Sequence, residues 1–195
     1  YSNFADLSDV KTIFGVFDFL KELFERIGNE QSGGMALANF DNDLASIFTT
    51  LGVDYKSNKE IFFAAIRDLI IWCNNTHTRM GQTSYYISFN IGLAENDFAR
   101  FLAFTLLDEF YHAGELIYKP NIIFKVAKGI SRNTHDRNYD LLMKALECTG
   151  KKMIPTYLLC DCEMDKDTSP ELLSVMGCRT RVVADRFGKT GAIGR

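Results

Sequence analysis

The chain has 195 residues, of which 47% are hydrophobic and 24% are charged, and its formal net charge is −3. This composition is that of an ordinary globular chain, and its charge gives no general basic field for binding nucleic acid. No apolar run reaches the ~18–20 residues that a membrane-spanning helix needs. We therefore expect neither nucleic acid nor a membrane among its partners.

The regular elements are predicted from the spacing of apolar residues. A stripe at three- and four-residue steps runs from Val10 to Ile27 and predicts a first helix, which Ser8 can cap and Gly28 can end. The same reasoning predicts, in chain order, helices over about 58–74 and 96–113, a strand over 82–92, a strand over 121–126, a helix over 138–148 and a strand over 154–160. Strands and helices alternate from residue 82 onward, which favours parallel strands joined by crossover helices in an α/β sheet or barrel.

The strand over 82–92 has two different faces. Tyr85, Ile87 and Phe89 would point one way, while the opposite face carries hydroxyl and amide groups. The polar face consists of Ser84, Tyr86, Ser88 and Asn90. Such a face is informative if it lines a cavity, so Ser88 and Asn90 are candidate ligand-facing residues.

The five cysteines are odd in number and irregularly spaced, which argues against a disulfide framework and favours reduced thiols in a cytoplasmic protein. They are Cys73, Cys148, Cys160, Cys162 and Cys178. Cys160 and Cys162 could bind a metal ion, but no second pair lies near them. We expect Cys160 to end a buried strand and Cys162 to open the solvated acidic loop 161–167, and we expect no metal site in this chain.

Two further patterns are weak. The histidines His77, His112 and His135 do not have the spacing of metal ligands, and we expect His77 to satisfy buried polar groups. Gly188-Lys189-Thr190 imitates the end of a phosphate-binding loop, but position 183 is Val where that motif requires Gly. A turn is the better interpretation of residues 188–190.

The segment Met176-Gly177-Cys178-Arg179-Thr180-Arg181 has two interpretations. Cys178 is either a free thiol without a chemical function or a reactive cysteine on a tight loop. The neighbouring arginines would favour a thiolate and ionic nucleophilic chemistry. No pairing of a cysteine with a histidine is evident in the sequence, so both interpretations stay open at this point.

Four segments carry a resemblance. They are Gly33-Gly34 with Asn39-Phe40-Asp41, then Asn75-Thr76-His77-Thr78-Arg79-Met80-Gly81-Gln82 with Ser88-Phe89-Asn90-Ile91-Gly92, then Ile123-Phe124-Lys125-Val126 with Gly129 and Asn138-Tyr139-Asp140-Leu141, and finally Met176-Gly177-Cys178-Arg179-Thr180-Arg181-Val182. In this order they resemble anaerobic (class III) ribonucleoside-triphosphate reductases, in which the last segment is similar to the radical-cysteine loop. Ser84-Tyr85-Tyr86 departs from the Pro-Phe pair usual in that family.

The resemblance implies an α/β fold that is part of a ten-stranded α/β barrel of the glycyl-radical enzyme type, with an inserted cysteine loop. Within the single unit 1–195, it implies a helical dimer and effector region over 1–30, barrel strands and helices over 31–170, and the active-site cysteine loop over 171–195. Cys178 would be the catalytic residue that forms a thiyl radical. Met176, Gly177, Ser88 and Asn90 would bind substrate.

The implied activity is reduction of ribonucleoside triphosphates to deoxyribonucleoside triphosphates for DNA synthesis and repair. The resemblance also implies a glycyl radical and a zinc site outside this segment, ATP or deoxynucleotide effectors, and formate or a thiol as reductant. The implied partners are a radical S-adenosylmethionine iron–sulfur activase and a second copy in a homodimer. We expect the chain to be an excerpt that is inactive alone. The alternatives are another glycyl-radical enzyme acting on a small carbon substrate and a non-enzymatic α/β binding module.

Overall fold

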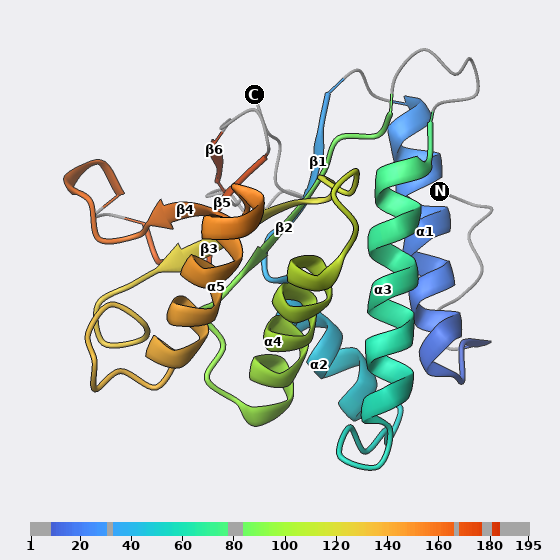
Figure 1. The fold of residues 1–195 in the computed structure, drawn as a ribbon, viewed down its shortest axis with the longest axis horizontal. Coiled ribbons are helices and arrows are strands. Elements are labelled where there is room, and N and C mark those ends of the chain that lie inside the picture. The colour runs from blue at the N-terminus through green and yellow to red at the C-terminus, as the bar shows by residue number, and fades with distance from the viewer. Residues whose placement is uncertain (1–8, 31–32, 78–83, 166–167, 177–180, 184–195) are drawn as a thin grey trace.

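The computed structural model describes residues 9–30, 33–77, 84–165, 168–176 and 181–183 (Figure 1). Its elements in chain order are α1 Ile13–Glu30, β1 Met35–Leu37, α2 Phe40–Thr50, α3 Lys59–Asn75, β2 Ile87–Ile91, α4 Asp97–His112, β3 Asn121–Val126, α5 Tyr139–Lys152, β4 Thr156–Leu159, the short 3₁₀ helix η2 Glu163–Asp165, β5 Leu173–Val175 and β6 Arg181–Val183.

The main sheet has four parallel strands in the order β1-β2-β3-β4, which is also their order in the chain. Helices α2 and α3 connect β1 to β2, α4 connects β2 to β3, and α5 connects β3 to β4 (Figure 1). The predicted α/β fold with parallel strands is therefore confirmed. The last two strands, β5 and β6, form a separate antiparallel pair.

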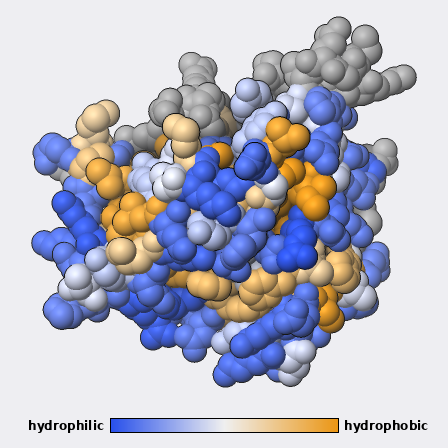
Figure 2. All heavy atoms as spheres, viewed as in Figure 1, coloured by the Kyte–Doolittle hydropathy of each residue, from blue (hydrophilic) through white to orange (hydrophobic). Residues whose placement is uncertain are grey.

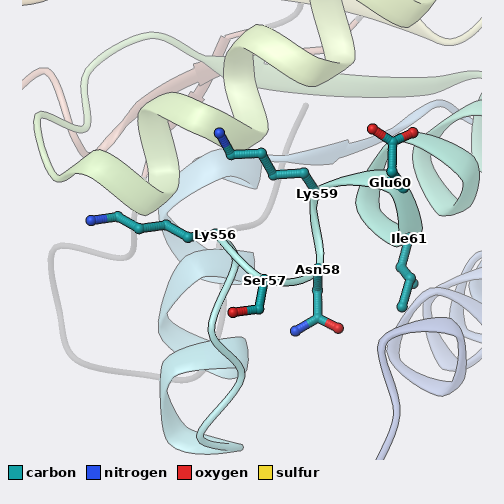
Figure 3. Close-up of a pocket in the computed structure, with 6 residues that line it drawn as sticks. All are labelled: Lys56, Ser57, Asn58, Lys59, Glu60 and Ile61. Atoms are coloured by element: carbon teal, nitrogen blue, oxygen red, sulfur yellow. The ribbon is translucent and has the colours of Figure 1, made fainter.

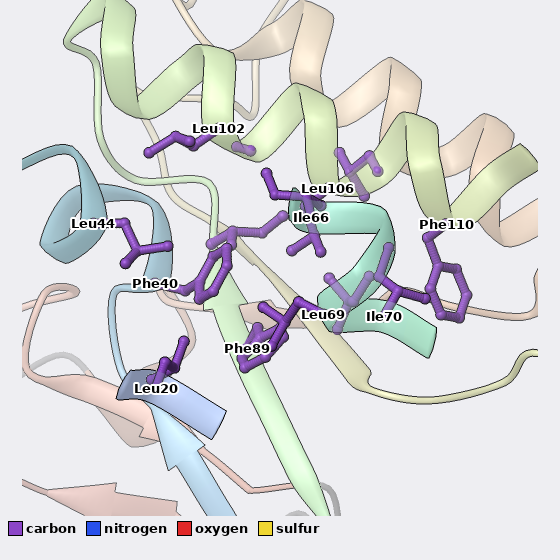
Figure 4. Close-up of a cluster of buried hydrophobic side chains, with 14 of the residues drawn as sticks. Leu20, Phe40, Leu44, Ile66, Leu69, Ile70, Phe89, Leu102, Leu106 and Phe110 are labelled. Atoms are coloured by element: carbon purple, nitrogen blue, oxygen red, sulfur yellow. The ribbon is translucent and has the colours of Figure 1, made fainter. Parts of the chain in front are cut away.

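The hydrophobic core lies between the sheet and its helices. Phe89 of β2 is fully buried and stacks on Phe40 of α2, with ring centroids 4.4 Å apart. The ring centroid of Phe24 in α1 lies 6.0 Å from that of Phe89. Leu69 of α3 and Leu106 of α4 belong to the same buried cluster (Figure 4). One core thus unites α1 through α4 with the sheet.

The first helix differs from the expectation in three places. It begins at Ile13 and not near Val10, it does not end at Gly28 but continues to Glu30, and Phe14 is 42% exposed although its spacing puts it in the predicted stripe. A Cβ atom on Gly28 would lie 2.5 Å from a ring carbon of Tyr85. Gly28 therefore permits a close approach of α1 to the segment before β2 and does not terminate the helix. The predicted cap, Ser8, lies outside the described residues.

The sequence did not reveal β1 and α2. Strand β1 has only three residues, which is too short for an alternating pattern, and the first turn of α2 contains Asp41, Asn42 and Asp43 between its apolar positions. Three other boundaries differ by two residues or more: β2 begins at Ile87, α5 continues to Lys152 and β4 begins at Thr156. Boundaries of this kind depend on hydrogen bonds that the pattern of apolar residues does not specify.

Hydrophilic side chains cover most of the face seen in Figure 2, and hydrophobic ones form separate patches among them. Among the helices that the structure describes, none combines the length and the apolar character needed to cross a membrane.

Candidate functional site

The two faces of β2 have different environments. Phe89 packs into the helical core, whereas the next residue, Asn90, points to the opposite face and contacts β5. Ser88 and Asn90 are both buried, with exposed fractions of 1% and 0%. The predicted alternation of apolar and polar faces is thus confirmed for this strand, and its polar face is turned toward β5.

Asn90 uses its side-chain amide to join β5 to the parallel sheet. Its Nδ2 atom donates to the carbonyl oxygens of Leu37, at 3.0 Å, and Val175, at 3.2 Å. Its Oδ1 atom accepts a hydrogen bond of 3.2 Å from the backbone N–H of Val175. Both hydrogens of the amide are therefore already donated to backbone, and Val175 is held through its N–H and its carbonyl together.

A second set of contacts holds the turn that precedes β5. The Lys125 Nζ atom, at the end of β3, donates to Asn39 Oδ1 at 3.1 Å and to the carbonyl of Pro170 at 3.3 Å. Asn39 also donates from Nδ2 to the carbonyl of Glu171 at 3.2 Å. Sequence reasoning did not single out Lys125 or Asn39 as site residues. The available signal was a lone lysine within the apolar run 122–126.

Strand β5 leads directly into the segment that contains Cys178. Val175 of β5 pairs with Arg181 of β6, so residues 176–180 connect the two strands and Cys178 is the central one of these five. Gly177 and Cys178 lie outside the described residues. Met176 is half-buried beside Gly34, where an added Cβ would lie 4.0 Å from the Met176 Cβ. That Met176, Gly177, Ser88 and Asn90 bind substrate stays a prediction.

Buried charges lie at the carboxyl ends of the parallel strands. Asp41 is 2% exposed and accepts a hydrogen bond of 2.9 Å from the backbone N–H of Gly92, just after β2. Burial raises the pKa of Asp41 to about 6, against the opposing effects of its backbone donors and of Lys125. Lys125 is 1% exposed, and burial lowers its pKa to about 8, although Cys160 and Asp41 act in the opposite direction.

The Cys160-Asp161-Cys162 segment is only partly as expected. Cys160 is buried, and this burial raises the pKa of its thiol to about 11, but β4 itself is exposed at Thr156 and Leu159. The expectation of a buried strand before Cys160 was therefore wrong, because β4 is the last strand of the parallel sheet as described. The acidic loop is not wholly solvated either, since Asp165 is buried and lies 2.8 Å from the Cys162 sulfur.

His77 does not join this site. His77 is exposed, and its Nδ1 atom lies 2.7 Å from the carbonyl oxygen of Asn75. The expectation that His77 satisfies buried polar groups was therefore wrong. Residues 188–190 lie outside the described part. Within the described ranges, the structure brings together no group of three or more His, Cys, Asp or Glu side chains that could hold a metal ion.

A surface hollow lies away from these residues. It is lined by the six consecutive residues Lys56 to Ile61, at the loop before α3 and its first turn (Figure 3). A single chain segment supplies all of its side chains, and no residue of the polar contacts around β5 takes part. We therefore assign it no role in the candidate site.

The fold and these contacts define a class: a parallel α/β protein in which buried polar side chains hold β5, the strand that precedes Cys178 in the sequence, against one face of the sheet. The model of the anaerobic ribonucleoside-triphosphate reductase family matches residues 10–195. The chain therefore belongs to that family.

Three curated relatives carry the name anaerobic ribonucleoside-triphosphate reductase. The Haemophilus influenzae protein is 32% identical over 122 residues, which are 60% of this chain and 17% of that protein. The Salmonella typhimurium protein is 30% identical over 129 residues, which are 64% of this chain and 18% of that protein. The Escherichia coli protein is 23% identical over 197 residues, covering 90% of this chain and 27% of its own length. The chain thus spans about a quarter or less of each relative.

Proposed function

We propose that this chain is the part of an anaerobic ribonucleoside-triphosphate reductase that carries the radical cysteine, Cys178. Family membership supports the reaction, since the matching relatives are named for it. The observation that supports the assignment to Cys178 is the pairing of Val175 with Arg181, because Cys178 is the central residue of the five that separate them in the sequence. Buried side chains of the parallel sheet hold β5, the strand that contains Val175.

The proposed chemistry is a series of hydrogen-atom transfers at sulfur. Cys178 gives the hydrogen of its thiol to a glycyl radical that another part of the protein supplies, and its sulfur becomes a thiyl radical. That sulfur then takes a hydrogen atom from the 3′ carbon of the ribose, which re-forms the S–H bond and leaves the unpaired electron on the sugar. The 2′ hydroxyl takes up a proton and leaves as water, and formate or a thiol supplies two electrons. Cys178 finally returns its hydrogen atom to the 3′ carbon, which regenerates the thiyl radical.

A thiol that reacts by hydrogen-atom transfer must carry its proton in the resting state. Cys160, which packs in one apolar cluster with Leu173 of β5, has its pKa raised to about 11 by burial, so this thiol stays protonated. Exclusion of water would also protect a radical. Within this proposal, Met176, Ser88 and Asn90 are the substrate-facing candidates among the described residues, and Gly177 would give a ligand close access to the backbone because it has no side chain.

The finer fold, cofactor and partner assignments belong to the same proposal. The four parallel strands would be consecutive strands of a ten-stranded barrel, and the connection around Cys178 would be inserted into it. Region 1–30 would serve the dimer and effector function, 31–170 the barrel and 171–195 the cysteine loop. A zinc site, a nucleotide effector site, an iron–sulfur activase and a cytoplasmic location complete the assignment.

The direct test replaces Cys178 by Ser in the whole reductase that contains this segment. We expect no nucleotide reduction, because a hydroxyl does not replace a thiol in reversible hydrogen-atom transfer, while the glycyl radical signal in electron paramagnetic resonance stays normal. Cys162→Ser is the matched control, since Cys162 lies outside the proposed loop, and it should retain activity. Turnover by the Cys178 variant at the wild-type rate would overturn the proposal.

A binding measurement separates this function from a glycyl-radical enzyme for small carbon substrates. Isothermal titration of the whole protein with a ribonucleoside triphosphate should give saturable binding. An absence of nucleotide binding, together with normal folding, would favour the other class of radical enzyme.

A further inference from the structure

We infer that Asn90, together with Asn39 and Lys125, positions the Cys178 connection by holding both ends of β5 against the parallel sheet. This inference rests on the proposed function, and it gives these three residues a role different from substrate binding. We call them the β5 clamp. None of them needs to touch the nucleotide, so they are positioning residues that act through Cys178.

The clamp replaces the backbone hydrogen bonds that β5 lacks toward the main sheet. Strand β5 pairs only with β6 in the described structure and belongs to a separate sheet. At its carboxyl end, the Asn90 amide satisfies the N–H and the carbonyl of Val175 at once, as a neighbouring strand would. Its third hydrogen bond, to the carbonyl of Leu37, fixes the amide plane relative to β1.

The other end of β5 is held through the turn before it. Lys125 and Asn39 bind the carbonyl oxygens of Pro170 and Glu171, and a hydrogen bond between Lys125 and Asn39 connects the two side chains. Leu173 lies between the two anchored ends and is fully buried in an apolar cluster with Cys160. The strand therefore has two polar anchors and one apolar contact over six residues.

The position of β5 limits the position of Cys178 because the chain is short between them. Cys178 is three positions after Val175 in the sequence, and three residues of chain span at most about 11 Å. Hydrogen-atom transfer requires sulfur and ribose carbon to meet at close range, and a misplacement of about 1 Å can cost about a hundredfold in rate. Loosening the Asn90 anchor should therefore reduce turnover more than nucleotide affinity.

The test uses Asn90→Ala and Asn90→Asp in the whole reductase. The Ala variant loses all three hydrogen bonds, and the Asp variant keeps an acceptor for the Val175 N–H but, when ionised, cannot donate to either carbonyl. We expect kcat to fall by about a hundredfold in the Ala variant with an unchanged KM for nucleotide. Alkylation of Cys178 by iodoacetamide, followed by mass spectrometry in the resting enzyme, should become severalfold faster.

Asn138→Ala is the matched control for Asn90→Ala. Asn138 is also fully buried, donates to the backbone carbonyls of Gly92 and Ala94 and accepts from Arg100, so its hydrogen bonds go to residues outside β5. Its variant should lose comparable stability while the alkylation rate of Cys178 and the value of kcat stay near wild type. Equal losses of kcat in both Ala variants would show that Asn90 acts on stability alone, and this would overturn the inference.

Asn39→Ala provides the second variant if Asn90 variants do not fold, because Asn39 is only half-buried and anchors the opposite end of β5. Unchanged alkylation and kcat in this variant and in Asn90→Ala would refute the clamp. Faster alkylation of Cys178 in the clamp variants, combined with an active Cys178→Ser enzyme, would support the clamp and refute the proposed function.

Discussion

The buried carboxyl of Asp41 gives a pH dependence of stability whose sign is set by the structure. Burial raises its pKa from 3.8 to about 6, so the folded state binds a proton more tightly than the unfolded state. The stabilisation from this proton is fully present below pH 3.8 and is lost as the pH rises through about 6. At ~1.4 kcal/mol per pKa unit, the full effect is about 3 kcal/mol, of which about 2 kcal/mol falls between pH 4.5 and 7.5.

The perturbation that isolates this effect is Asp41→Asn, which keeps the shape of the side chain and removes its titration. Urea denaturation of both chains at pH 4.5 and 7.5 gives the free energies of unfolding, with fluorescence of the single tryptophan, Trp72, as the probe. Trp72 stacks near Phe24 and therefore reports on the core. We expect the stability of wild type relative to the variant to be about 2 kcal/mol greater at pH 4.5 than at pH 7.5.

Asp54→Asn is the control for this experiment. The hydroxyl of Ser57 and backbone N–H groups hold the pKa of Asp54 below 3.8, so its titration lies below the range tested. The difference between wild type and this variant should change little between the two pH values. If the Asp41 comparison were equally flat, the reasoning that links burial of Asp41 to proton binding would be wrong.

Two further predictions concern the residues around the site. Phe89→Ala should destabilise the chain by about 3–5 kcal/mol in urea denaturation, because it leaves a cavity beside Phe40, whereas a loss well under 1 kcal/mol would mean that the core closes without it. The pKa of Lys125 in the folded wild type is about 8, below the ordinary 10.5, so the folded state binds this proton less tightly than the unfolded state. The free energy of unfolding of the wild type should therefore increase as the pH rises above 8, and Lys125→Met should remove this increase. Between pH 7.5 and 9.5 the wild type should gain about 2 kcal/mol relative to the variant, and no relative gain would contradict the burial argument for Lys125.

Much of the local structure could be predicted because it depends on short-range patterns. The strand over 121–126 was predicted with its observed bounds, and the helices α3 and α4 were predicted to within about one residue at each end. The side-chain amide of Asn96 accepts from the backbone N–H of Ala99 and caps α4, which explains why that start was visible in the sequence. Short or polar-rich elements such as β1 and α2 carry no comparable signal.

The sequence by itself determined the α/β alternation and the order of the segments that identify the reductase family, and it drew attention to Cys178. These properties depend on residues that are close together along the chain. Only the tertiary structure decided that the side-chain amide of Asn90 hydrogen-bonds to Val175, 85 positions later, and that the buried Lys125 donates to the carbonyl of Pro170. Hydrogen-bond partners so far apart are chosen by how the elements pack, and the periodicity of one strand does not contain that information.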